Sequence, residues 1–159
     1  MTKNLDKEGF SSIVDNYQLF YVDLWGVIHN GVFLHNEAIK VLNEISKKKK
    51  DYILLTNAPR PNQAVKSFLE RMGMQKEIRD HVFTSGEAAL KYLKKNLLGK
   101  SFFHIGPPRD FDLFKDFKKE KSQNIENCNY ILCTGLFDDF NEDLTFYKNL
   151  FEKNLKKKL

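Results

Sequence analysis

A carboxylate, Asp23, closes a short apolar run and is the residue of this chain best placed to do chemistry. The run, residues 19–22, is too short for a helix and rich in β-forming residues, which predicts a strand buried on both faces. An ionised carboxylate is unfavourable in such surroundings unless it is paired, hydrogen-bonded or metal-bound. At the carboxyl end of a parallel strand all three are available, because ligands bind there in open α/β sheets. The alternative is that Asp23 only caps a turn or helix.

A second polar group, Thr56-Asn57, ends the next apolar run, residues 52–56. Right-handed crossovers can put consecutive parallel strands side by side, so Asp23 and Thr56 are expected to share one crevice. A carboxylate beside a hydroxyl and an amide suits nucleophilic attack on phosphorus, because the hydroxyl and nearby backbone amides can hold the phosphoryl oxygens. A divalent ion would offset the repulsion between carboxylate and phosphate.

The rest of the chain alternates between strand and helix patterns. Gly26 permits a tight turn after Asp23, and Asn30-Gly31 is a strong turn signal, so a short flap is expected there. Strands are predicted at residues 19–23, 52–56, 81–85, 101–106 and 130–135. Helices are predicted at 36–49, 61–72, 87–96, 110–118 and 141–156, with a short one near 11–17. Asn36 is the expected N-cap of its helix, and Gly73 is an expected C-cap. This alternation predicts an α/β fold with parallel strands.

Composition narrows the class of protein. The chain has 159 residues, 42% of them hydrophobic, which is enough to bury a core. No apolar run is long enough to cross a membrane, and the first ten residues lack the apolar centre of an export signal. Cys128 and Cys133 are too few for a disulfide scaffold and wrongly spaced for a Cys-x-x-Cys site. We therefore expect a cytoplasmic protein, with Cys133 buried and inert.

The net charge of +5 comes from 26 Lys and Arg against 21 Asp and Glu. Two lysine runs, residues 47–50 and 156–158, each close a predicted helix, where cations favour the negative end of the dipole. Nucleic-acid binding is the weaker interpretation, because no aromatic stacking pattern accompanies these runs. No nucleic-acid or membrane partner is expected.

The quoted residues resemble motifs of the haloacid dehalogenase-like (HAD) hydrolase superfamily. Asp23-Leu24-Trp25-Gly26-Val27 looks like its motif I, and Leu54-Leu55-Thr56-Asn57 looks like its motif II. The wider text, from Asp23 to Gly31 and from Leu55 to Arg60, is similar to class IIA, which carries a large α/β cap. Residues 83–86 and 104–106 also sit where class IIA members have similar text.

The resemblance implies a fold and a site. Residues 1–98 would be the first part of a HAD-like Rossmannoid core, with its motif I strand central, and residues 99–159 the start of the cap. Asp23 would be the nucleophile, forming an aspartyl-phosphate, and Thr56 would bind the phosphoryl group. Asn57, Trp25 and Gly26 would contact substrate. Magnesium would be held by Asp23 and the Trp25 backbone carbonyl, and the substrate would be a small phosphorylated metabolite.

Two departures from the family pattern keep other functions open. Trp25 stands where the family's phosphatases usually have a second Asp as general acid and base, and an indole has no titratable proton near neutral pH. Haloacid dehalogenases also have an aromatic residue there and use no metal. Motif III, which supplies a lysine, and motif IV, which supplies acidic metal ligands, are not found in the sequence. The alternatives are an inactive or truncated HAD-like protein with a partner-dependent role, which could self-associate through exposed apolar surface, and a phospho-acceptor receiver domain.

Several other polar residues have simpler interpretations. His29 and His35 are expected to be hydrogen-bonded or solvated loop histidines, and His104 a satisfied core histidine. Arg60 and Arg109 could meet a phosphate or serve ordinary surface roles. Finally, an acidic group is expected to stabilise a helix N-terminus rather than hold a metal; its members are Asp138, Asp139, Glu142 and Asp143.

Overall fold

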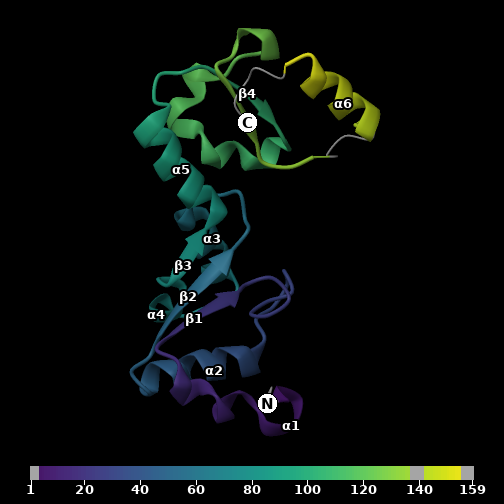
Figure 1. Cartoon of the computed structure of the whole chain (residues 1–159). Helices are drawn as coiled ribbons and strands as arrows, with labels where there is room; N and C mark the ends of the chain where they lie inside the picture. The colour runs from purple at the N-terminus through teal and green to yellow at the C-terminus, as the bar shows by residue number, and fades with distance from the viewer. Residues whose placement is uncertain (1–3, 137–141, 155–159) are drawn as a thin grey trace. The chain divides into compact units, whose positions relative to one another are not determined.

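The computed structural model describes residues 4–136 and 142–154, which fall into two compact units. The first unit comprises Met1–Ala58 and Asn62–Thr84, and the second comprises Pro59–Pro61 and Ser85–Leu159. Each unit contains a parallel sheet with helices, so the predicted α/β fold is confirmed (Figure 1). Among the described residues, no helix combines the length and apolar character needed to cross a bilayer.

The first unit is a three-stranded parallel sheet in the order β1-β2-β3 (Figure 1). Its elements are β1 (Leu19–Asp23), α2 (Asn36–Lys47), β2 (Asp51–Thr56), α3 (Asn62–Arg71), α4 (Lys76–Arg79) and β3 (Val82–Thr84). The predicted parallel pairing of β1 with β2 is confirmed, and β3 pairs with β2 in parallel. The expectation that the Asp23 strand is central is wrong for the described sheet. Both crossovers step the same way across the sheet, so β2 lies in the middle and β1 at an edge.

One face of this sheet is covered and the other is open. Alternate strand residues such as Phe20, Val22 and Leu54 pack with Leu42 of α2 and Leu69 of α3 in one core. On the opposite face the side chains are exposed, as for Leu19 (41%), Tyr21 (67%) and Leu55 (45%). The prediction that β1 is buried on both faces is therefore wrong, because α2 and α3 pack on the same side.

Local hydrogen bonds set the helix ends. The N-cap of α2 is His35 rather than the predicted Asn36, because the His35 N–H donates to Ile28 O at 2.8 Å and holds His35 in an extended conformation. At the end of α3, the Met74 N–H donates to Leu69 O at 3.0 Å, and Gly73 has a φ of +86°. This is the glycine C-cap that the sequence predicts.

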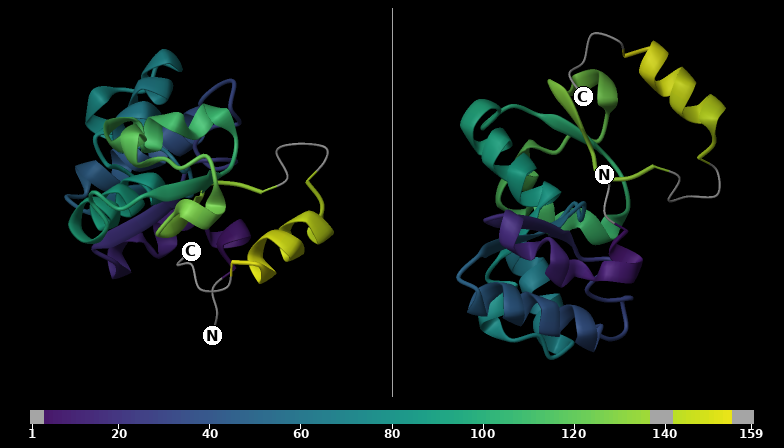
Figure 2. Two further views of the ribbon diagram at one scale, coloured as in Figure 1. Left: turned by 90° about the horizontal axis from the view of Figure 1, so that it is seen from above. Right: turned by 60° about the horizontal axis from the view of Figure 1, so that its bottom comes forward.

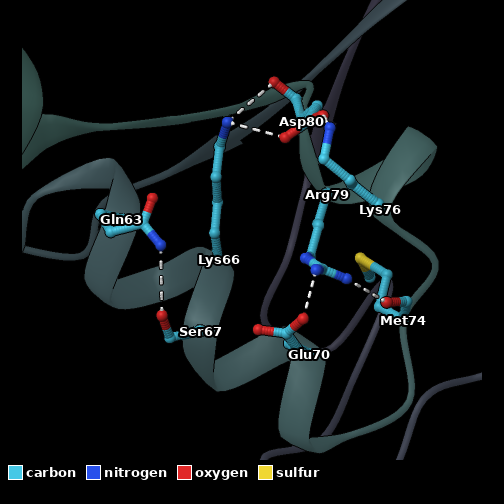
Figure 3. Close-up of polar contacts among 8 residues, drawn as sticks. All are labelled: Gln63, Lys66, Ser67, Glu70, Met74, Lys76, Arg79 and Asp80. Atoms are coloured by element: carbon cyan, nitrogen blue, oxygen red, sulfur yellow. Dashed lines mark hydrogen bonds and ion pairs between the residues drawn. The ribbon is translucent and has the colours of Figure 1, made fainter.

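Charged side chains join α3 to α4, just before β3. Figure 3 shows Lys66 reaching the carboxylate of Asp80, with an Nζ–Oδ1 distance of 3.2 Å; Lys76 contacts the other oxygen at 2.7 Å. Hydrogen bonds from these two lysines, Lys76 first, lower the pKa of Asp80. Arg79 pairs with Glu70 and also donates to Met74 O at 3.0 Å (Figure 3). These contacts fix the short α4 turn that leads into β3.

The N-terminal segment runs alongside α2 (Figures 1 and 2). It contains α1 (Leu5–Glu8) and two short 3-10 helices, η1 (Phe10–Ser12) and η2 (Val14–Asn16), where a helix near 11–17 is predicted. Lys48 Nζ lies 2.9 Å from Asp15 Oδ1, and Lys50 Nζ donates to Tyr17 O at 2.6 Å. Part of the lysine run at 47–50 therefore anchors this segment.

The second unit has a two-stranded parallel sheet, β4-β5. Its elements are α5 (Ser85–Asn96), β4 (Phe102–Ile105), η3 (Pro108–Leu113), η4 (Lys115–Glu120), η5 (Ile125–Asn127), β5 (Tyr130–Cys133) and α6 (Leu144–Glu152). The last helix is described over a shorter range than the predicted 141–156; residues 141, 155 and 156 lie outside the described residues. Cys133 is exposed and Cys128 is buried, so the expectation of a buried Cys133 is wrong. Partial desolvation nevertheless raises the pKa of the Cys133 thiol.

The predicted α-helix at 110–118 is instead a pair of 3-10 helices. Phe114 and Phe117 leave the helical region, with φ of −127° and −129°. Both rings pack edge-on against the fully buried Phe102 of β4, at centroid distances of 5.2 and 5.8 Å. Tertiary packing around Phe102 therefore overrides the helical spacing of the phenylalanines. His104 is satisfied as predicted, with its Nε2 2.9 Å from Thr134 Oγ1.

Candidate active site

Asp23 is the last residue of β1 and is exposed to solvent. Its Oδ1 accepts a hydrogen bond from the Leu24 N–H at 2.8 Å, and Leu24 itself is fully buried beneath the turn. The buried leucine thus anchors the turn from which the carboxylate projects. The carboxylate is therefore held by one backbone amide and remains accessible to a ligand.

Thr56 is the last residue of the neighbouring strand β2, so it lies at the same carboxyl-terminal end of the sheet as Asp23. In the β1–β2 register Asp23 lies opposite Leu55, so Thr56 is one residue further along the adjacent strand. Its Oγ1 accepts a hydrogen bond from the Ala58 N–H at 3.3 Å, which folds the chain into a tight turn after β2. Asn57, within this turn, is exposed. Asp23 and Thr56 therefore end adjacent parallel strands, as the sequence predicts.

A flap formed by residues 24–35 follows Asp23. The Gly26 N–H donates to His29 O at 2.8 Å, and the Ile28 N–H donates to Leu24 O at 2.9 Å. The predicted turn at Asn30-Gly31 is present, since Asn30 Oδ1 accepts from the Phe33 N–H at 3.0 Å and Gly31 has a φ of +90°. The flap is thus held by its own backbone hydrogen bonds directly beside Asp23.

Trp25 is 66% exposed and lies across Gly31 within the flap. A Cβ at position 31 would come within 2.8 Å of the indole ring, so the ring rests on the glycine backbone. The far side of the indole remains in solvent. Trp25 is therefore a fixed aromatic surface beside Asp23, and it has no group that could act as an acid or base at neutral pH.

His29 is buried under the flap. Its Nδ1 accepts a hydrogen bond from the Gly31 N–H at 3.0 Å, and its ring packs edge-on against Trp25 and Phe68. Burial lowers the pKa of His29, and nearby His35 lowers it further, while Asp23 acts in the opposite direction. His29 is thus a neutral residue that supports the flap, as a hydrogen-bonded loop histidine is expected to be.

Asn62 supports the site and was not predicted from the sequence. Asn62, the first residue of α3, accepts a hydrogen bond at its Oδ1 from the Thr84 N–H at 2.9 Å. Thr84 is fully buried at the end of β3, opposite Thr56 in the register. Asn62 therefore ties the start of α3 to the end of β3. Only its position after Pro61, at a helix start, hints at such a role in the sequence.

A magnesium ion would find only part of its ligand set in the described residues. Asp23 offers a carboxylate and Trp25 a backbone carbonyl, whereas magnesium requires octahedral oxygen coordination. No group of three or more His, Cys, Asp or Glu side chains suited to a metal lies within residues 4–136 and 142–154. Asp138 and Asp139 lie outside the described residues, and Asp143 caps α6 by accepting from the Phe146 N–H at 2.6 Å.

Comparison with known proteins identifies the family. A family described as haloacid dehalogenase-like hydrolase matches residues 20–119. A haloacid dehalogenase-like hydrolase from Brucella suis is 28% identical, with a TM-score of 0.74 over 92% of this chain and 53% of that chain. A search of curated proteins found no match to this chain.

Two more distant structures share the fold. The 4-nitrophenylphosphatase of Thermotoga maritima is 22% identical, with a TM-score of 0.62 over 89% of this chain and 54% of that one. The glycerol phosphate phosphatase of Mycobacterium tuberculosis, solved with magnesium, is 16% identical, with a TM-score of 0.56 over 87% and 41%. The chain spans about half the length of these proteins. Because the family match covers more than half of the chain, from the Asp23 strand onward, the chain belongs to the haloacid dehalogenase-like hydrolase family.

Proposed function

We propose that this chain carries the nucleophile and phosphoryl-binding half of a phosphatase that acts on a small phosphorylated metabolite. The observation that carries the proposal is the position of Asp23 and Thr56 at the carboxyl ends of adjacent parallel strands. Related structures named as phosphatases support this reaction class. The class IIA assignment, with a core over residues 1–98, a cap beginning near residue 99 and a cytoplasmic location, belongs to the same proposal.

In the proposed reaction Asp23 attacks the phosphorus atom. An Asp23–phosphorus bond forms as the bond from phosphorus to the leaving oxygen breaks, and water then releases phosphate from the aspartyl-phosphate. The Thr56 hydroxyl and the backbone amide of Asn57 would hold the phosphoryl oxygens as charge develops on them. The Gly26 N–H already donates to His29 O, so Gly26 would contact the substrate without donating this hydrogen bond. Magnesium at Asp23 and the Trp25 carbonyl, when bound, would neutralise phosphate charge.

The described residues around Asp23 include no evident proton donor for the leaving oxygen. Trp25 cannot supply this proton, and a positioned general acid typically contributes a factor of about a hundred to ten thousand in rate. We therefore expect phosphorylation of Asp23 by reactive donors to outpace turnover of ordinary monoesters. Trp25→Asp is expected to speed phosphorylation of Asp23 by ordinary monoesters, because the added carboxyl could protonate the leaving oxygen.

The test is direct labelling of the chain. The protein is incubated with magnesium and acetyl phosphate or 4-nitrophenyl phosphate, and peptide mass spectrometry locates hydroxylamine-sensitive phosphate. Label is expected on Asp23, lost in Asp23→Asn and reduced in Thr56→Ala. Asp51→Asn is the matched control, because Asp51 is an exposed carboxylate at the opposite end of β2. Label that persists in Asp23→Asn would overturn the proposed mechanism.

A non-catalytic role is the second candidate, and Trp25 is the observation that favours it. An exposed aromatic residue fixed on Gly31 is better suited to contacting a partner than to moving protons. The same labelling experiment separates the two candidates. A folded chain that takes no label from either donor would favour the non-catalytic role.

A further inference from the structure

The segment that follows the Thr56 turn is short and stiff. Arg60 stands between Pro59 and Pro61, and these three residues group with the second unit although the residues before and after them belong to the first. Each proline fixes its own φ and restricts the residue before it to extended conformations. Ala58 and Arg60 are therefore both restricted, so a displacement of Arg60 is passed along the chain rather than absorbed.

The backbone of Arg60 lies directly against Gly86 at the start of α5. A Cβ added at Gly86 would lie within 3.0 Å of the Arg60 N, C and O atoms. Contacts of that length with backbone atoms are not tolerated, so any larger residue at position 86 would push Arg60 away. Gly86 is itself buried. The close approach, rather than a positive φ, explains a glycine in the first turn of this helix.

The side chain of Arg60 faces a buried carboxylate. Asp110 of η3 is 3% exposed, and its Oδ1 lies 3.8 Å from Arg60 Nε. Burial of a carboxylate is unfavourable without a cation or hydrogen bonds to compensate, and Arg60 is the cation present. Backbone and side chain of Arg60 are thus held by two different parts of the second unit.

From these contacts we infer that Arg60 is a positioning residue for Thr56. Gly86 and Asp110 fix Arg60, the two prolines keep the connection stiff, and the Ala58 N–H donates to Thr56 Oγ1 at 3.3 Å. The hydroxyl orientation at the end of β2 is therefore set partly by the contacts of Arg60. The importance of this coupling for catalysis rests on the proposed function, but the coupling itself is measurable without activity.

Hydrogen exchange of the full chain tests the coupling. Loss of the contact between Arg60 and Asp110 should free the turn that follows β2. Arg60→Ala and Asp110→Asn should therefore each speed exchange of the Ala58 amide by about tenfold. The double variant should exchange no faster than either single variant, because both remove the same contact. Arg60→Lys retains the cation and should restore most of the protection. Gly86→Ala should reproduce the loss by displacing the Arg60 backbone.

Arg109→Ala is the matched control, since Arg109 also follows a proline and neighbours Asp110 in sequence. It should leave the Ala58 amide unchanged, and the amide of Leu54 in the middle of β2 should be unchanged in every variant. Equal exchange of Ala58 in wild type and Arg60→Ala would overturn the inference, as would an equal effect of Arg109→Ala. Failure of Asp23 labelling would count against the proposed function and not against this coupling.

Discussion

At the scale of single residues, Gly31 is required by both its conformation and its neighbour. Its φ of +90° is unfavourable for an L side chain, and the Trp25 ring occupies the space of a Cβ. Gly31→Ala should therefore lower the free energy of unfolding by about 1–3 kcal/mol, measured by urea denaturation. In the Trp25→Ala background the clash is gone and only the backbone term remains, so the loss should be smaller. An equal loss in both backgrounds would contradict the described contact.

Two histidines, the buried His29 and the half-buried His104, predict how stability varies with pH. Burial lowers the pKa of His29 and of His104 from the ordinary value of 6.5. The unfolded chain therefore takes up protons at a higher pH than the folded chain, so stability is present above 6.5 and is lost as the pH falls below it. The urea midpoint should drop between about pH 7.5 and pH 5.5. His29→Asn, whose Oδ1 can replace Nδ1 as acceptor for Gly31, should reduce that drop; an unchanged slope would contradict the prediction.

The roles of individual residues could be predicted only where they depend on nearby sequence. Asp23 and Thr56 could be placed near each other because each is the last residue of a strand, and the carboxyl ends of parallel strands lie at the same end of a sheet. The pairing of Arg60 with Asp110 joins residues fifty positions apart and has no local signal. The prediction that Cys133 is buried was wrong because β5 is short and Cys133 lies at the exposed end of this strand.

At the scale of elements, hydrophobic periodicity located the strands and long helices because each has one side in a core. It failed at residues 110–118, where phenylalanines at helical spacing pack around Phe102 from two 3-10 helices. It also could not show that α2 and α3 cover the same face. That outcome depends on the direction of the crossovers, and it leaves Tyr21 and Leu55 exposed.

The N-terminal segment is an element held largely by lysines from the end of α2. Lys50 Nζ donates to Tyr17 O at 2.6 Å, so Lys50→Met should release the segment and speed proteolysis near residue 17 severalfold. Because exposed charge contacts are weak, the change in global stability should stay below about 1 kcal/mol. Lys49→Met is the matched control: it removes the neighbouring ammonium and leaves the contacts of Lys48 and Lys50 in place. Equal cleavage of the two variants would show that Lys50 is not an anchor.

At the scale of the whole molecule, the open face of the first sheet favours self-association. Tyr21, Leu19 and Leu55 are exposed on one face, beside the unpaired edge of β1 in the described sheet. Sedimentation velocity should show oligomers that increase with protein concentration. Tyr21→Lys should shift the population at least about tenfold toward monomer without lowering the melting temperature. Lys91→Glu, on α5 of the second unit, is the charge-change control; a wild-type monomer at high concentration would refute the prediction.

The parallel arrangement of β1, β2 and β3 also determines the order in which the first unit can fold. Phe20 pairs with Tyr52 and Leu54 with Val82, so each pairing closes a loop of roughly thirty residues and neither is a local hairpin. During synthesis, β1 can find no partner within the first unit until β2 has left the ribosome. The apolar strand β1, which carries Asp23, therefore stays unpaired while α2 is synthesised. If α2 forms early, it shortens the distance between β1 and β2 that the chain has to close. A pause in translation once residue 56 has emerged from the ribosome would therefore favour correct pairing, whereas crowding of nascent chains at that point would favour aggregation.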